Sequence, residues 1–338
     1  MADLWPEARI YTSLYDPEGT EGHFAHRSVR TSYLQRLGVG QRGFRRLLPL
    51  FPAAIERLPV AGHDVLVSSS SAFAHGVRPA PGAVHVCYCY SPFRYVWHER
   101  EATLAGFPRV WRPAAAITFD AIRRWDIGAS ERVTRYLCCG EIARERIHEF
   151  YGREASVVHP PVEVERFDAP PAPEDHFLVV CELVAHKRVD LALEAARRSG
   201  KRVQVVGTGP EAERLAVRYA GVAEFLGRVD DAELARLYSR ALALVVPNIE
   251  EFGIAAVEAQ AAGRPVLAVD GGGARETVRV GETGVLVSRT VDALGEAMSE
   301  IDFTRFEPAE ARANAANFSR ARFQERLAAQ VRETVRMR

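Results

Sequence analysis

The chain has 338 residues, of which 47% are hydrophobic and 26% charged, and its formal net charge is zero. This composition indicates a folded globular protein of about two domains, and excludes a disordered or collagen-like chain. The charge balance argues against a nucleic-acid-binding protein, because phosphate recognition normally requires a basic excess. We find no apolar run long enough for a transmembrane helix and no signal peptide at the first residues.

The first half of the chain alternates short apolar runs with helical patterns. Strands are expected at 9–13, 64–68, 84–90, 135–138 and 156–159, and helices near 43–58, 112–127 and 141–151. Prolines then cluster at 160–161 and 170–173. Because proline at this density excludes a helix and favours an extended connector, we expect the domain boundary near residue 168.

The second half is more regular, with Val-rich apolar runs alternating with amphipathic helices. Strands are expected at 177–181, 203–206, 223–226, 241–246, 265–269 and 284–287, and helices at about 188–199, 210–220, 231–240, 253–263 and 274–280. Strands that are apolar throughout are buried on both faces, so this alternation predicts a parallel, doubly wound α/β sheet.

The predicted architecture is therefore two doubly wound α/β domains facing a cleft. The first domain covers 1–168 and the second 169–318, and a last helix at 319–338 packs back toward the first domain. Ligands bind such sheets beyond the carboxyl ends of the strands. We therefore looked for chemically active residues in the loops directly after strands.

Five cysteines are present, and none forms a C-x-x-C pair. Most of them lie in apolar runs, which is typical of buried, reduced thiols in a cytoplasmic protein. Two thiols on one strand face are a poor zinc site without further ligands, so no metal site is expected. The cysteines are Cys87, Cys89, Cys138, Cys139 and Cys181.

The most informative segment is 247–258, which follows the strand at 241–246 and opens a helix. Gly253 would let a ligand approach the backbone, and the first N–H groups of the helix suit a diphosphate. Glu250 precedes the helix and could accept hydrogen bonds from sugar hydroxyls. An acidic helix start explains Glu250 equally well, but it does not explain Glu258, which lies among core-like residues.

Two other loops carry candidate residues. Lys187 follows the strand at 177–181 and is one of only two lysines in a chain that otherwise uses arginine. A lysine at this position can neutralise a departing diphosphate. The segment 88–97 contains Arg94 and Tyr95, which could contact a substrate, although Tyr95 and Trp97 could equally belong to the core.

These motifs together resemble those of retaining nucleotide-sugar glycosyltransferases of family four, which have the GT-B fold and an E-x7-E motif. The resemblance spans nearly the whole chain and continues through 206–210, 225–229, 259–266, 271–273 and 281–284. It implies transfer of a hexose to a polysaccharide, lipid-linked or small-molecule acceptor. The subset most similar to this sequence uses GDP-mannose, and the resemblance implies no metal and no cofactor besides the nucleotide-sugar substrate.

The resemblance also implies roles for individual residues. Glu250 would contact the donor sugar, Glu258 the ribose hydroxyls, and Lys187 the diphosphate, and Lys187, Glu250 and Arg94 would be the catalytic residues. The remaining donor-side candidates are Arg188, Gly227, Arg228, Val229, Phe252, Gly253 and Ile254, and the acceptor-side candidates are Tyr90, Ser91, Arg94 and Tyr95.

Several departures from the family pattern keep a second interpretation open. Glu182 stands where the family has a phosphate-binding arginine, and Tyr90 replaces a histidine. A carboxylate beside a diphosphate repels it. The family's first strand and Gly-rich loop are also expected to be missing. A non-catalytic homologue that serves as a partner subunit or sugar-nucleotide binder is therefore the alternative.

Arginine and tryptophan alternate at 109–112 and 123–125. A basic, aromatic helix face can lie on lipid headgroups, which would place a cytoplasmic protein peripherally on the inner membrane face. The other interpretation, which we favour from the sequence, is a salt-bridged surface with buried tryptophans.

Overall fold

The structure is a computed structural model that describes residues 1–38, 43–167 and 172–337. It divides into two compact units, which are Met1–Val158 with Arg326–Arg338, and His159–Glu325. The boundary lies after Val158, earlier than the predicted residue 168. The reason is that the segment after Val158 packs on the second unit, where the Val162 N–H donates to the Phe318 carbonyl at 2.9 Å. Residues 168–171 themselves lie outside the described residues.

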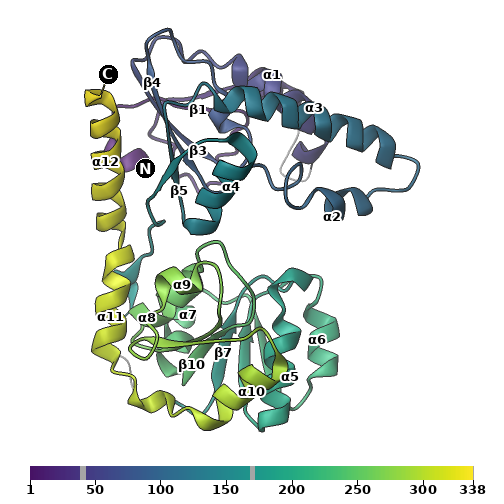
Figure 1. The fold of residues 1–338 in the computed structure, drawn as a ribbon, viewed down its shortest axis with the longest axis vertical. Helices are drawn as coiled ribbons and strands as arrows, with labels where there is room; N and C mark the ends of the chain where they lie inside the picture. Colours follow the sequence, from purple (N-terminus) through teal and green to yellow (C-terminus); the bar gives the residue numbers. More distant parts are fainter. Residues whose placement is uncertain (39–42, 168–171, 338) are drawn as a thin grey trace. The chain divides into compact units, whose positions relative to one another are not determined.

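The second unit contains one six-stranded parallel sheet in the order β12-β11-β10-β7-β8-β9 (Figure 1). All six predicted strands are confirmed, and β10 and β11 are buried throughout, as their unbroken apolar runs require. The strands are β7 (Phe177–Val180), β8 (Val203–Val206), β9 (Ala223–Gly227), β10 (Ala243–Val246), β11 (Val266–Val269) and β12 (Gly284–Val287).

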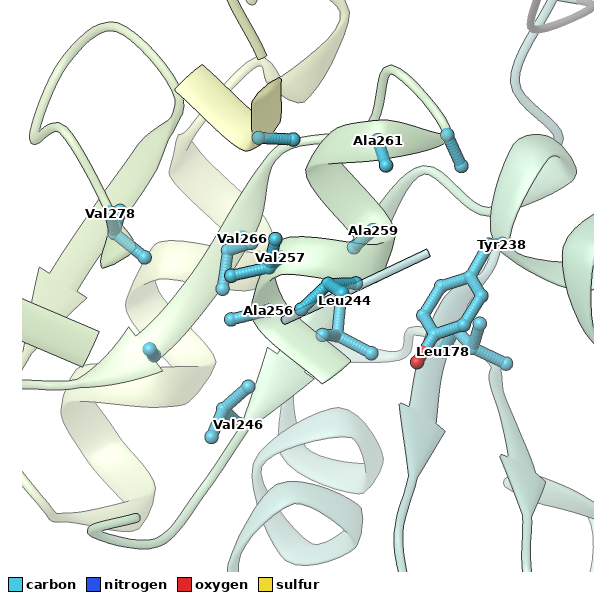
Figure 2. Packing of buried hydrophobic residues seen from close by; sticks show 14 of the residues in the cluster. Leu178, Tyr238, Leu244, Val246, Ala256, Val257, Ala259, Ala261, Val266 and Val278 are labelled. Atoms are coloured by element: carbon cyan, nitrogen blue, oxygen red, sulfur yellow. The ribbon is translucent and has the colours of Figure 1, made fainter. Parts of the chain in front are cut away.

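Helices and two hydrophobic clusters cover the faces of this sheet. Alternate residues of one strand enter different clusters, as with Leu244 and Val245 of β10, because successive side chains point to opposite faces. Figure 2 shows the cluster that packs α8 onto the sheet through Val257 and Ala256. The α-helices are α5 (Val189–Ser199), α6 (Ala212–Arg218), α7 (Asp231–Arg240), α8 (Ile254–Ala261), α9 (Ala274–Thr277), α10 (Val291–Glu300) and α11 (Pro308–Ala315).

Short 3-10 helices complete the second unit, and a long terminal helix follows it. The short helices are η5 (Val164–Arg166), η6 (Ala185–Lys187), η7 (Phe303–Arg305) and η8 (Ala316–Phe318). The terminal helix α12 (Arg320–Arg336) begins in the second unit, and its residues from Arg326 onward group with the first. There the Arg135 guanidinium lies 2.8 Å from the Glu333 carboxylate.

The first unit contains a four-stranded parallel sheet whose order β3-β4-β5-β6 follows the chain. The strand expected at 9–13 forms as β1 (Ile10–Thr12), but it pairs with β2 (Val29–Thr31) in a separate two-stranded sheet. The sequence did not predict β2, because three residues show no periodicity. The four sheet strands are β3 (Val65–Ser70), β4 (Val84–Cys89), β5 (Arg135–Cys138) and β6 (Ala155–Val157).

The predicted helices of the first unit are present, with one difference. The expected helix at 43–58 is split into the 3-10 helix η3 (Phe44–Leu50) and α1 (Phe51–Glu56), because Pro49 and Pro52 supply no N–H groups there. The other elements are α2 (Arg100–Ala105), α3 (Arg112–Ser130), α4 (Glu141–Tyr151), η1 (Ala2–Leu4), η2 (Tyr33–Leu37) and η4 (Ala74–Gly76). None of the described helices combines the length and the hydropathy needed to span a bilayer.

A buried carboxylate organises the core of the first unit. Asp126 is fully buried, and its Oδ2 accepts hydrogen bonds from the Trp97 indole and the Tyr151 hydroxyl, each at 2.7 Å. His75 Nε2 lies 3.1 Å from its Oδ1. Trp97 is therefore a core residue, in agreement with one of the two interpretations left open by the sequence.

Candidate active site

The strand order of the second unit reverses between β7 and β10, which are hydrogen-bonded neighbours in the sheet. In an open α/β sheet, such a reversal leaves a crevice beyond the carboxyl ends of the two strands, and ligands bind there. The loop after β7 carries Lys187, and the loop after β10 carries Glu250. The fold therefore directs two predicted catalytic residues to the same edge of the sheet.

Lys187 and Glu250 form an ion pair across this reversal. The Lys187 ammonium donates hydrogen bonds to both carboxylate oxygens of Glu250, at 2.6 and 2.8 Å. The Asn248 side-chain amide donates to the Glu250 Oε1 at 3.0 Å. Lys187 and Glu250 are 21% and 24% exposed, so the pair is accessible to a ligand. The ammonium is thus neutralised by a carboxylate.

The N-terminus of α8 lies directly after Glu250 in the chain. Its N-cap, Gly253, has a φ of 85°, which the left-handed region readily allows only for glycine. The loop is fixed from the other side by Gly273, whose N–H donates to the Glu250 carbonyl at 2.9 Å. A Cβ on Gly273 would lie 2.0 Å from the Phe252 carbonyl oxygen, so this close backbone approach requires glycine. The first N–H groups of α8 are left without intrahelical acceptors.

The second carboxylate of the motif, Glu258, is held by two side chains that the sequence analysis did not identify. The Arg166 guanidinium lies 2.6 Å from its Oε1, and the Tyr238 hydroxyl donates to its Oε2 at 2.8 Å. Burial raises the pKa of Glu258 above its ordinary value, while Tyr238 and Arg166 act in the opposite direction. Nothing in the local sequence marked these partners, because they lie 92 and 20 residues away.

A buried amide fixes the position of α8 itself. The Gln260 side chain donates to the carbonyl groups of Ala256 and Thr277, each at 2.9 Å, and accepts from the Asn314 amide at 2.6 Å. These bonds connect α8 to α9 and α11. The helix that carries Glu258 is therefore ordered before any ligand arrives, which reduces the entropy lost on binding.

The other predicted donor-side residues lie around this centre without sharing one contact network. Arg188 has a φ of 51° and pairs with Asp190 at 3.2 Å, and it lines a pocket of about 250 Å³ together with Glu211 and Arg214. Glu182 is exposed. Gly227 has a φ of 67° at the end of β9, Arg228 is exposed, Val229 packs on the core, Phe252 is buried and Ile254 is half exposed.

The acceptor-side candidates belong to the first unit, at the carboxyl end of β4. Tyr90 is 40% exposed, and the Ser91 hydroxyl accepts from the Arg146 guanidinium at 3.3 Å. Arg94 is half exposed and lies 3.8 Å from the Glu99 carboxylate, while the Tyr95 ring packs edge-on against Phe93. The third predicted catalytic residue, Arg94, thus belongs to a different unit from Lys187 and Glu250.

Comparison with known proteins finds sequence similarity over the second unit. Residues 161–317 match the family model described as "Glycosyl transferases group 1". A GDP-mannose-dependent alpha-(1-6)-phosphatidylinositol monomannoside mannosyltransferase of Mycobacterium tuberculosis is 34% identical over 191 residues, which are 47% of this chain and 50% of the relative. A D-inositol 3-phosphate glycosyltransferase of Nocardia farcinica is 41% identical over 109 residues, covering 30% of this chain and 24% of the relative. The chain thus spans at most about half the length of these relatives.

Solved structures show the same fold across both units. Sucrose-phosphate synthase from Thermosynechococcus elongatus aligns with a TM-score of 0.71 at 18% identity, covering 98% of this chain and 90% of that protein. HepE of Anabaena, in complex with UDP and glucose, aligns with a TM-score of 0.65 at 15% identity, covering 96% of this chain and 92% of HepE. The predicted architecture of two Rossmann-like α/β domains, the GT-B fold, is thus confirmed. Residues 161–317 of this chain are thus similar in sequence to glycosyl transferases group 1.

Proposed function

We propose that this protein is a retaining glycosyltransferase that transfers a hexose from a nucleoside diphosphate sugar to an acceptor. The observation that carries the proposal is the Lys187–Glu250 ion pair at the strand-order reversal, beside the N-terminus of α8. An ammonium and a helix N-terminus stabilise the charge that develops on a departing diphosphate. In this proposal these groups supply the positive charge in place of a metal ion.

Glu250 has two roles in this scheme. Its carboxylate holds the Lys187 ammonium until the donor binds, and then accepts hydrogen bonds from hydroxyl groups of the donor sugar. The bond between the anomeric carbon and the diphosphate breaks while the bond to the acceptor oxygen forms on the same face, and the acceptor hydroxyl gives its proton to the departing diphosphate. Arg94, with Tyr90, Ser91 and Tyr95, would contact the acceptor in this proposal.

GDP-mannose is the proposed donor, and a lipid-linked saccharide the favoured acceptor. The support is that the mycobacterial relative is named as a GDP-mannose-dependent enzyme acting on a phosphatidylinositol monomannoside. A polysaccharide or small-molecule acceptor remains within the same proposal. Cys87, Cys89, Cys138 and Cys139 are buried and form no disulfide, which fits a reducing compartment such as the cytoplasm.

We also propose that the first unit contacts an anionic membrane through the connection between α2 and α3, which lies at the end of α3 remote from the sheet (Figure 1). Phe107, Val110, Trp111 and Ile117 are 38%, 78%, 63% and 69% exposed there. A cluster of exposed apolar side chains marks an interaction surface, and tryptophan favours the boundary of lipid and water.

Charge decides the kind of surface that this cluster fits. Arg109 is exposed beside Val110 and Trp111, whereas the nearby acidic Glu101 and Asp120 both bind Arg100. The cluster is therefore apolar with a basic excess, which complements anionic headgroups. The other Arg/Trp segment is different, because the Trp125 indole donates to Glu56 at 2.9 Å inside the unit.

Calorimetric titration with GDP, UDP, ADP and GDP-mannose tests the main proposal. We expect micromolar binding of one nucleotide, which disappears in Glu258→Ala and persists in Glu282→Ala, a change at an exposed glutamate paired with Arg279. We also expect release of free nucleotide from the matching sugar donor. If no nucleotide binds to the folded protein, the enzyme proposal is wrong, and the chain is better explained as a non-catalytic partner subunit, as Glu182 would favour.

A further inference from the structure

Arg166 and Tyr238 each bind one oxygen of the Glu258 carboxylate. Arg166 Nη2 lies 2.6 Å from Oε1, and the Tyr238 hydroxyl lies 2.8 Å from Oε2. A carboxylate oxygen has about two lone-pair sites. Each oxygen of Glu258 therefore keeps one site for a further donor, and the two free sites belong to one rigidly held group. Two neighbouring hydroxyl groups of a ligand match this arrangement.

Arg166 is itself fixed, although it lies in a short 3-10 helix before the first strand of the second unit. Its guanidinium carbon lies 4.8 Å from the centre of the Phe167 ring, and its Nη1 lies 3.5 Å from Asp231 Oδ1. The Phe167 ring packs edge-on against Tyr238, with ring centres 5.9 Å apart. The Phe167 ring thus contacts both residues that hold Glu258, Arg166 and Tyr238.

The arginine also has an electrostatic role at this position. Glu258 is largely buried, at 16% exposure, and burial favours the neutral acid. The charged groups that face it are Arg166 from η5, Asp231 from α7 and Glu163 just before η5, together with the Tyr238 hydroxyl. Arg166 is the cation among them. Without it, the carboxyl group would face two acids in a buried setting, and its ionised form would be disfavoured.

We propose that Arg166 is a positioning residue for donor binding, which keeps Glu258 ionised and oriented so that its two oxygens accept hydrogen bonds from the vicinal ribose hydroxyls. This inference rests on the proposed function, which assigns a nucleotide to the site. It adds that selectivity for ribose over deoxyribose depends on the segment before the second unit's first strand, and not only on the helix that carries Glu258.

The test compares affinities for the nucleoside diphosphate that the wild-type protein binds and for its 2′-deoxy form, measured by calorimetry between pH 6 and pH 9. Removing a hydrogen bond to a charged group changes affinity by roughly 10-fold to 100-fold. We therefore expect the wild-type protein to prefer ribose by about 10-fold or more. We expect Arg166→Ala to lose most of this preference, and Arg166→Lys, which keeps the charge, to retain part of it.

The pH dependence of the preference for ribose would not change if the role of Arg166 were only structural. In Arg166→Ala the pKa of Glu258 rises further, so the preference for ribose should recover partly as the pH increases. The phosphates of the ribose and deoxyribose nucleotides titrate alike, so their effect cancels in the ratio of the two affinities. In a Glu258→Gln background, Arg166→Ala should change the ratio little further. Arg236→Ala, which breaks an exposed ion pair on α7, is the matched control.

Thermal unfolding of each variant shows whether it is folded, and Arg166→Lys keeps the test decisive if Arg166→Ala does not fold. A wild-type preference for ribose that is unchanged in both folded Arg166 variants would overturn the inference and leave the proposed function intact. Absence of nucleotide binding by the wild-type protein would overturn both. An Arg166→Ala variant that binds both nucleotides equally at pH 6 supports the inference.

Discussion

The Lys187 ammonium donates hydrogen bonds to both oxygens of the Glu250 carboxylate, with Nζ to Oε distances of 2.6 and 2.8 Å. The two residues are 63 positions apart and follow different strands of one sheet. A diphosphate that approaches Lys187 must therefore compete with a carboxylate already bound there. The donor sugar can compensate by giving Glu250 new hydrogen-bond donors.

Neutralising Glu250 should separate affinity for the nucleotide from turnover. In Glu250→Gln the ammonium of Lys187 is no longer paired with a negative charge, so we expect tighter binding of the nucleoside diphosphate alone. We expect kcat to fall by about 100-fold, because the sugar loses a charged hydrogen-bond acceptor and the transition state a fixed charge. Calorimetry with the diphosphate and assays with the sugar donor measure the two effects. Equal weakening of both would contradict the competition described above.

Removing the Lys187 ammonium should have the opposite effect on the affinity for the nucleoside diphosphate. Lys187→Ala leaves the Glu250 carboxylate facing the phosphates without a counter-charge, so both diphosphate affinity and kcat should fall, the latter by about 100-fold to 1000-fold. Lys201→Ala is the matched control, because Lys201 is the only other lysine of the chain. The role assigned to Lys187 is wrong if both variants retain wild-type turnover.

Loss of the Asp126 carboxylate should destabilise the first unit. In Asp126→Ala the Trp97 indole and the Tyr151 hydroxyl lose their shared acceptor inside the core. Breaking a buried charged network lowers the free energy of unfolding by about 3–5 kcal/mol. Urea denaturation followed by tryptophan fluorescence measures the change. Asp120→Ala, at a half-exposed ion pair with Arg100, should change the unfolding free energy by less than about 1 kcal/mol.

Acid should destabilise the first unit through His85. Burial, together with the nearby His75 and Arg132, lowers the pKa of His85 to about 3. Between pH 6.5 and pH 3 the unfolded chain binds a proton at this residue that the folded state does not, so stability falls as the pH is lowered. His85→Gln should reduce the slope of the unfolding free energy against pH in this window. The exposed His26, changed to Gln, should leave the slope as it is.

The membrane surface can be tested by vesicle flotation. We expect the wild-type protein to float with vesicles that contain phosphatidylglycerol and not with neutral phosphatidylcholine vesicles. Trp111→Ser combined with Arg109→Ser should reduce the bound fraction several-fold, since it removes an interfacial anchor and a charge worth about 1 kcal/mol. Val217→Ser, at a residue of the second unit that is 76% exposed, is the control. Flotation that is equal for all three proteins would show that this surface does not bind the membrane.

The second unit could be predicted from the sequence far better than the first. Its strands are short apolar runs buried on both faces, so composition alone indicates them, and Lys187 and Glu250 directly follow such runs. β2 carries no comparable signal, because its three residues are partly exposed. The connector could be recognised by its prolines. The sequence did not indicate that Val162 and Phe167 pack into the core of the second unit.

The partners of Glu258 were missed for a different reason. Arg166 lies in η5 and Tyr238 in α7, so only the tertiary fold brings them to Glu258, and their positions in the chain follow no short motif. The exposure of Trp111 and the partial burial of Trp125 also could not be separated, since each tryptophan lies within two residues of an arginine. In each case the local sequence is compatible with more than one environment for the side chain, and tertiary packing decides which one it has.

The scarcity of lysine gives the Lys187–Glu250 pair a practical consequence. A protein with two ε-amino groups is nearly a single-site target for acylating reagents, and Lys201 supplies an internal reference within the same molecule. The rate at which Lys187 is labelled therefore reports how often its ammonium leaves Glu250. Mass spectrometry of the labelled chain would then follow occupancy of the site without any assay of turnover and before an acceptor has been identified.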